Sequence, residues 1–128
     1  MKTLLRDIIE WDVKNWSVIL EFWNKSINTL DKNNKIKALE LGSRNGGLSL
    51  WLALNNIETI CTDLNVSIKA KELHTKYKVN NLISYDKVDI TDIKFENDTF
   101  DIVIFKSVLG ALKTKENQIK AINEIYRV

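Results

Sequence analysis

The chain has 128 residues, of which 45% are hydrophobic and 28% are charged, so it can form one domain with a buried core. Its 19 lysines and arginines nearly balance 17 acidic residues and are interspersed with them, so no basic stripe indicates nucleic-acid binding. Arg6, Asp7 and Glu10 interrupt the N-terminal segment before a signal-peptide core could form, and no apolar stretch reaches transmembrane length, which favours a cytoplasmic protein without a membrane partner.

The N-terminal segment, residues 1–35, is expected to be a helical extension. Its apolar side chains recur at mostly helical spacing, which predicts one or two amphipathic helices. Asp12 is the expected N-cap of the second helix, and the polar stretch at residues 31–35 is the expected connector. Trp11 and Trp16 fit either packing onto a sheet or a lid over bound ligands. Packing is favoured, because helically spaced aromatic residues more often fill a core.

After residue 35 the apolar pattern changes to short strands that alternate with helices. Strands are expected at 36–41, 57–62, 82–88 and 100–105, and helices at 48–54, 66–77 and, after the N-cap Thr114, 115–128. This order implies right-handed crossovers and an α/β fold with an open parallel sheet of about four strands. The last strand has an unbroken apolar core, which suits a central position covered on both faces. Cys61, in the second strand, is expected to be a buried thiol.

A glycine loop joins the first strand to the next helix. Gly42 and Gly46 stand where the chain must turn tightly and let a ligand approach its backbone. A dinucleotide fingerprint would need a second glycine where this chain has Arg44, so a ligand without pyrophosphate is favoured. The loop therefore predicts a ligand-binding turn at the carboxyl edge of the sheet.

Two acidic residues follow the next two strands. Asp63 ends the second strand, where a carboxylate can accept hydrogen bonds from both hydroxyls of a ribose. Asp63 or Asn65 could equally serve as a helix N-cap. Asp89 and Ile90 open a polar turn after the third strand, where one carboxylate and one backbone amide could bind an adenine.

In order and spacing, these features resemble those of the class I (Rossmann-like) S-adenosylmethionine-dependent methyltransferase family. Residues 39–47 resemble its motif I, commonly Glu or Asp, x, Gly, x, Gly, x, Gly, although Arg44 replaces the middle glycine. Asp63 matches the family's ribose-binding acid, and Asp89 with Ile90 matches its adenine-binding pair. The resemblance covers residues 36–128 and ends before a Lys-Pro-Gly turn, so we expect a donor-binding domain that lacks the last strands of the family fold.

The resemblance implies S-adenosylmethionine as cofactor and no metal. The cofactor-binding residues that it implies are Glu40, Gly42, Ser43, Arg44, Gly46, Asp63, Leu64, Asp89, Ile90, Phe105 and Lys106. Lys106 and Ser107 follow the fourth strand and, with Trp16, are candidates for binding the methyl acceptor. No catalytic base is identified, and His74, the single histidine, is expected to have a surface role.

The expected function is methyl transfer to a small-molecule or glycan-precursor acceptor. A non-catalytic S-adenosylmethionine-binding or structural subunit is the alternative, favoured by the missing strands and the absence of a recognisable base. A nicotinamide oxidoreductase is disfavoured by Arg44. Without further strands the fourth strand would be an exposed apolar edge, which a homodimer or a partner chain could cover.

Overall fold

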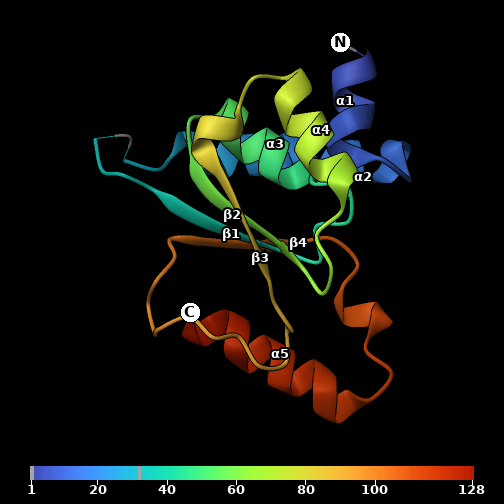
Figure 1. Cartoon of the computed structure of the whole chain (residues 1–128), viewed down its shortest axis with the longest axis vertical. Coiled ribbons are helices and arrows are strands. Elements are labelled where there is room, and N and C mark those ends of the chain that lie inside the picture. Colours follow the sequence, from blue (N-terminus) through green and yellow to red (C-terminus); the bar gives the residue numbers. More distant parts are fainter. Residues whose placement is uncertain (1, 32) are drawn as a thin grey trace.

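Four parallel strands form a single sheet in the order β3-β2-β1-β4 in the computed structural model (Figure 1). The structure describes residues 2–31 and 33–128, so Met1 and Lys32, which fall in the predicted extension and connector, lie outside the described residues. The strands are β1 (Lys37–Leu41), β2 (Glu58–Asp63), β3 (Ile83–Lys87) and β4 (Ile102–Phe105). The helices are α1 (Lys2–Ile9), α2 (Val13–Asn28), α3 (Gly47–Leu54), α4 (Ile68–Lys76) and α5 (Lys115–Arg127), with 3₁₀ turns at Asn80–Leu82 and Leu109–Ala111. The predicted Rossmann-like α/β fold with N-terminal helices is confirmed.

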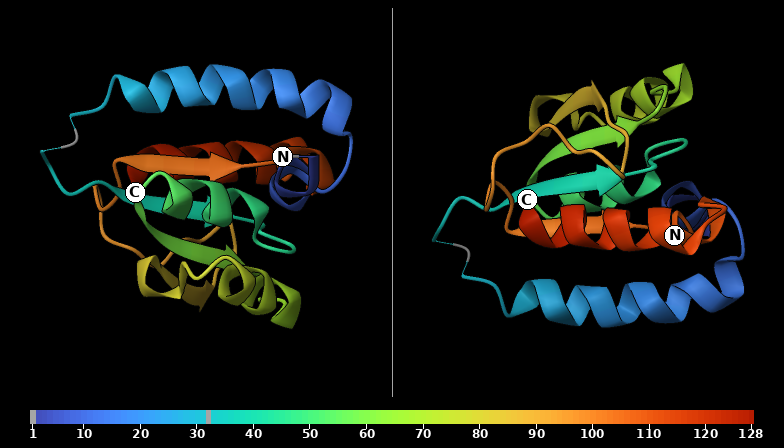
Figure 2. Two further views of the ribbon diagram at one scale, coloured as in Figure 1. Left: turned by 90° about the horizontal axis from the view of Figure 1, so that it is seen from above. Right: turned by 90° about the horizontal axis from the view of Figure 1, so that it is seen from below.

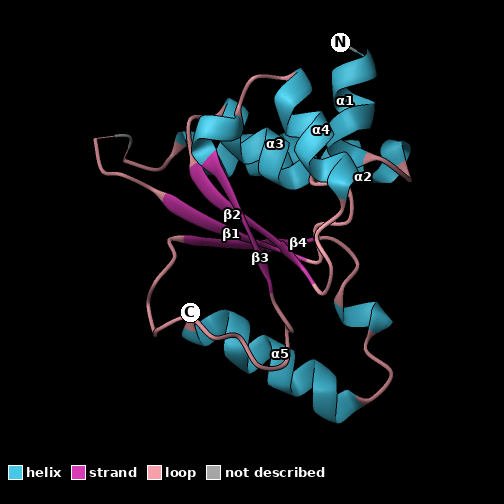
Figure 3. Ribbon diagram, in the orientation of Figure 1, coloured by secondary structure: helices cyan, strands magenta, loops and turns pink. Residues whose placement is uncertain are grey.

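The helices cover the sheet unequally. Helices α1 to α4 lie on one face, and α5 alone lies on the other (Figures 1 and 3). Helix α2 is the outermost helix on the β4 side of the molecule (Figure 2). Within residues 2–31 and 33–128, no helix is long and apolar enough to cross a membrane.

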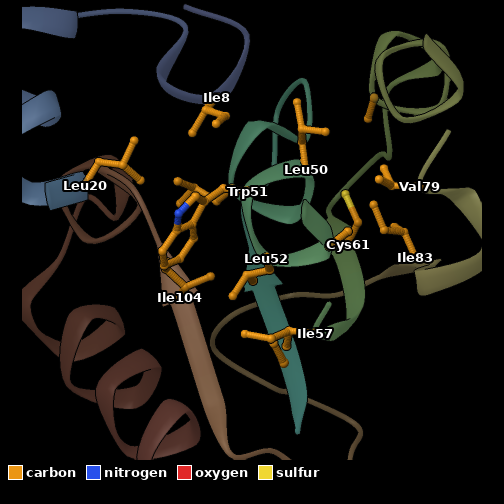
Figure 4. Close-up of a cluster of buried hydrophobic side chains, with 14 of the residues drawn as sticks. Ile8, Leu20, Leu50, Trp51, Leu52, Ile57, Cys61, Val79, Ile83 and Ile104 are labelled. Atoms are coloured by element: carbon orange, nitrogen blue, oxygen red, sulfur yellow. The ribbon is translucent and has the colours of Figure 1, made fainter. Parts of the chain in front are cut away.

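Two apolar clusters fill the spaces between these layers. The larger lies under α1 to α4, and Figure 4 shows Trp51 among its members near Ile104 of β4. The smaller lies between the sheet and α5 and includes Leu39 and Leu41, whose side chains alternate along β1 with that of Ala38 in the larger cluster. Both faces of β1 are therefore buried, as expected for the interior of a parallel sheet.

Three local predictions need correction, and two are confirmed. The most buried strand is β1; among the described residues β4 pairs with β1 alone and has only Ile104 buried, so the predicted central position covered on both faces is not observed for β4. Asp12 occupies the predicted N-cap position of α2, with φ 51°, but its side chain makes no cap hydrogen bond; its carboxylate instead accepts from the Asn15 side-chain amide. Helix α4 is capped by Ser67 rather than by Asp63 or Asn65, because the Ser67 hydroxyl accepts from the Lys69 backbone N–H. The caps and burial patterns confirm Thr114 as the N-cap of α5 and Cys61 as a buried thiol.

Candidate functional site

The main cavity of the described residues lies at the carboxyl edge of the sheet and has a volume of about 550 Å³. Ten of the predicted ligand-binding residues line it: Glu40, Gly42, Ser43, Arg44, Asp63, Leu64, Asp89, Ile90, Lys106 and Ser107. Three predicted residues, Gly46, Phe105 and Trp16, do not line it. The loops after β1, β2, β3 and β4 all contribute, as expected for a ligand site in an open parallel sheet.

The loop after β1 is held by main-chain hydrogen bonds. Gly42 has φ 61°, and a Cβ at this position would lie 2.5 Å from Cγ2 of Val108, so only glycine fits without displacing a neighbour. The Ser43 N–H donates to the Thr62 carbonyl oxygen at 2.8 Å, and the Gly46 N–H donates to that of Ser43 at 2.7 Å. The loop is therefore a fixed turn beside the cavity.

His74 anchors this loop from helix α4, which corrects the expected surface role. Its side chain is fully buried, and its Nε2 lies 2.8 Å from the Gly46 carbonyl oxygen. A carbonyl can only accept, so Nε2 carries the hydrogen and Nδ1 accepts from the Tyr85 hydroxyl at 2.7 Å. Burial lowers the pKa of His74, so the neutral ring is the stable form. Gly46, with φ 75°, thus supports the loop, and a Cβ added at this position would collide with the His74 ring.

Glu40 is a buried acid at the base of the cavity. It is 3% exposed, and its Oε2 accepts the Ser49 backbone N–H at 2.8 Å and the Ser49 hydroxyl. Burial raises the pKa of Glu40 to about 7, although the hydrogen bonds from Ser49 oppose this rise. The carboxylate thus lacks a cationic partner among the described residues and is available to a positively charged ligand group.

Asp63 ends β2 beside the glycine loop with its carboxylate fixed from both sides. Its Oδ2 accepts the Arg44 backbone N–H at 2.8 Å, and its Oδ1 accepts the Leu64 backbone N–H at 2.8 Å. Each carboxylate oxygen can accept a second hydrogen bond. The two oxygens can therefore still receive a pair of hydroxyl groups on a ligand.

Asp89 and Ile90 lie farther along the same edge, in the turn after β3. The Asp89 Oδ1 accepts from the Thr91 backbone N–H at 2.9 Å and the Thr91 hydroxyl at 2.7 Å. These two hydrogen bonds lower the pKa of Asp89, so it is ionised at neutral pH. Ile90 is buried at the cavity wall, where it gives a flat ring an apolar surface to pack on.

Lys106 fastens the joint between α1 and α2 to the end of β4. Its Nζ donates to the carbonyl oxygens of Ile9 and, at 2.8 Å, of Trp11. It also lies 4.2 Å from the ring centroid of Trp11 and 5.1 Å from that of Trp16, within cation–π range. Desolvation lowers the pKa of Lys106. With these donors engaged, Lys106 holds the N-terminal segment at the cavity edge.

The remaining predicted residues have structural contacts. Phe105 packs against the smaller apolar cluster below the sheet. The Trp16 ring lies between those of Trp11 and Trp23, at centroid distances of 6.5 and 6.0 Å, and Trp23 continues to Trp51 at 5.9 Å. This row of rings attaches α2 to α3, as the packing interpretation of the tryptophans expects.

The N-terminal segment forms part of the cavity wall, and of its wall residues the sequence pointed only to Trp11, through the alternative of a lid over bound ligands. Ile8, Ile9, Glu10 and Trp11 all line the cavity. Glu10 has a positive φ of 65°, and its Oε1 is buried with no hydrogen-bond partner among the described residues. No local pattern showed where the first helix would end or pack, so the position of Glu10 at the cavity could not be predicted.

Comparisons with known proteins identify the family and the fold of the chain. The family model described as "Methyltransferase domain" matches residues 39–128. No curated protein sequence matches the chain. The chain is similar to the solved structure of the MccD protein, with 27% identity, a TM-score of 0.64 and coverage of 84% of this chain and 46% of that one.

Two further solved structures have the same fold. A Pyrococcus horikoshii protein shares 22% identity at a TM-score of 0.69, with coverage of 96% of this chain and 57% of its own. A proposed sarcosine dimethylglycine methyltransferase from Galdieria sulphuraria shares 18% identity at a TM-score of 0.71, with coverage of 91% and 44%. The chain thus spans about half the length of these structures.

Proposed function

The chain belongs to the methyltransferase-domain family of class I, Rossmann-like proteins, and on that premise we propose that it binds S-adenosylmethionine for methyl transfer to a small-molecule or glycan-precursor acceptor. The observation that carries this proposal is the set of carboxylates at the carboxyl edge of the sheet. Glu40 lies next to the end of β1, Asp63 ends β2, Asp89 follows β3, and all three line one cavity. Because β1, β2 and β3 are neighbours in the sheet, the three carboxylates form a row that suits an elongated ligand with several hydrogen-bond donors.

The residues fit this cofactor by their chemistry. The Asp63 carboxylate retains acceptor capacity on both oxygens, which suits the two hydroxyls of a ribose. The Oδ2 of Asp89, which has no hydrogen-bond partner in the described part of the chain, and the apolar wall at Ile90 suit an amino-substituted base. At the other end, Glu40 supplies a buried negative charge for the ammonium group of an amino acid.

The cofactor brings the reactive group, a methyl group on a positively charged sulfur, and the protein brings binding and orientation. The fixed glycine loop and the Asp63 carboxylate hold a ligand without prior rearrangement, which lowers the entropic cost of alignment. The apolar side chains of Ile8 and Leu48 exclude water from part of the cavity wall. No covalent bond between the protein and the transferred methyl group is needed.

A small acceptor is supported by the polar side chains and the charge of the site. Polar side chains at the mouth include Arg44 and Ser107, both exposed and so accessible to an acceptor. A formal charge of +2, spread over the whole sequence, gives no continuous surface for a phosphate backbone.

The proposal is tested by calorimetric titration of the purified chain with S-adenosylhomocysteine, and with NAD as the control ligand. We expect saturable binding of S-adenosylhomocysteine near one molecule per chain and none of NAD. Binding of NAD without binding of S-adenosylhomocysteine would contradict the proposal. Binding of neither ligand would also contradict it, provided that circular dichroism shows the chain to be folded. Binding without turnover on a panel of sugar and metabolite acceptors would favour the non-catalytic alternative.

A further inference from the structure

We propose that Glu10, at the joint between α1 and α2, is a specificity-determining residue that binds the ammonium group of the donor together with Glu40. The inference rests on the proposed function, because it assigns a second carboxylate to the same ligand. Glu10 lies outside residues 39–128, the part of the chain that the family model matches. The family resemblance therefore does not account for its position.

The first support is an unsatisfied oxygen. The Glu10 side chain is only 19% exposed, and its Oε1 is buried without a hydrogen-bond partner among the described residues. Its nearest cation is Arg44, whose Nε lies 4.0 Å from Oε2, at the outer limit of an ion pair, on a side chain that is 66% exposed. A buried carboxylate oxygen without a donor is costly, so this position is suited to a donor supplied by a ligand.

The second support is that the joint is held rigidly over the glycine loop. Helix α1 contacts the start of α3 so closely that a Cβ at Gly47 would overlap the carbonyl oxygen of Ile8. Lys106 binds the carbonyl oxygens on either side of Glu10, those of Ile9 and Trp11. On the far side of α1, Asp7 accepts from Lys76 at 2.6 Å and from the Tyr77 hydroxyl at 2.7 Å. Glu10 is thus fixed at the cavity wall rather than free to turn into solvent.

The third support is the charge of the two acids. Glu10 and Glu40 line one cavity, and the negative charge of Glu10 adds to the burial that raises the pKa of Glu40. Burial raises the pKa of Glu10 as well, although the charge of Arg44, hydrogen bonds from Asn45 and the charge of Lys106 oppose this rise. Two desolvated carboxylates that repel each other are relieved by one cation between them, which a primary ammonium group with three N–H donors provides.

The backbone of the joint is consistent with this role. Glu10 and Asp12 both adopt a positive φ, 65° and 51°, which is uncommon for residues other than glycine. Such conformations persist only where surrounding contacts impose them, and they cluster at ligand sites. Here the contacts of Lys106 with the flanking carbonyl groups impose the turn that directs Glu10 to the cavity.

The test compares two ligands on three proteins by calorimetry: wild type, Glu10→Gln, and Glu72→Gln as the matched control on an exposed position of α4. S-adenosylhomocysteine carries the amino-acid group, whereas methylthioadenosine lacks it but keeps the adenosine part. We expect Glu10→Gln to weaken binding of S-adenosylhomocysteine by about tenfold and to leave binding of methylthioadenosine unchanged. Glu72→Gln should match wild type for both ligands.

The outcomes separate this inference from the proposed function. If wild type binds S-adenosylhomocysteine and Glu10→Gln binds it equally well, the role of Glu10 is refuted and the donor site stands. If the variant loses affinity for both ligands equally, Glu10 supports the fold of the site and does not recognise the ammonium group. If folded wild type binds neither ligand, the proposed function fails, and the inference fails with it.

Discussion

Replacing Glu40 by glutamine should make the protein more stable at neutral pH while weakening donor binding. Glu40 is 3% exposed, and burial raises its pKa from 4.5 to about 7. The folded state therefore holds the proton more tightly than the unfolded state, so ionising Glu40 costs stability as pH rises from 4.5 to 7. At about 1.4 kcal/mol for each pKa unit, the full cost above pH 7 is about 3 kcal/mol. The glutamine side chain in Glu40→Gln would keep an oxygen that accepts from Ser49 and would carry no charge.

Urea denaturation followed by tryptophan fluorescence at pH 4.5, 6, 7 and 8 measures this difference. The free energy of unfolding of Glu40→Gln minus that of wild type should rise by about 3 kcal/mol between pH 4.5 and 7 and then stay level. The exposed substitution Glu72→Gln should show no such rise. A difference between Glu40→Gln and wild type that is the same at every pH would refute the assignment of Glu40 as a buried carboxylate without a cationic partner. S-adenosylhomocysteine should bind the variant more weakly than wild type.

Three further substitutions test other parts of the site. Asp63→Ala should weaken calorimetric binding of S-adenosylhomocysteine by about 100-fold, since two hydrogen bonds to a charged group are lost; unchanged affinity would contradict the ribose assignment. Gly46→Ala should lower the free energy of unfolding by about 2 kcal/mol, because φ is 75° and the new Cβ would meet the His74 ring at 2.7 Å, and a stability equal to wild type would be inconsistent with the described loop. The folded-state pKa of His74 lies below 6.5, so wild type should lose stability relative to His74→Gln as pH falls below 6.5, and parallel pH profiles would exclude a buried neutral His74.

The sheet and its carboxyl edge could be predicted because their signals are local. Short apolar runs, each followed by glycine or an acidic residue, mark β1 and β2 with their loops, and the order of these elements fixes where Gly42, Asp63 and Asp89 meet. Parallel strands bring their carboxyl ends to one edge whatever the details of packing. The prediction of the edge therefore did not depend on long-range contacts.

The rest depended on contacts between distant residues, which no local pattern contains. His74 lies on a polar helix, and only its partners Gly46 and Tyr85 explain why it is buried. Glu10 reaches the cavity because Gly47, which has no side chain, leaves room for the end of α1. Lys106, about a hundred residues later in the chain, holds the joint between α1 and α2 in place. The apolar run of β4 overstated the burial of this strand, because the run does not show how many neighbouring strands the sheet provides.

The central claim is that S-adenosylmethionine binds at the carboxyl edge of the sheet, and backbone amide NMR with S-adenosylhomocysteine tests it most directly. We expect saturable chemical-shift changes concentrated at the glycine loop, residues 42–46, at Asp63 and Leu64, and at Asp89 and Ile90. A second cavity of about 370 Å³, lined by residues that include Asn34, Asn56 and Leu82, provides the contrast. Saturable changes confined to that second cavity, with none at the glycine loop, would contradict the account.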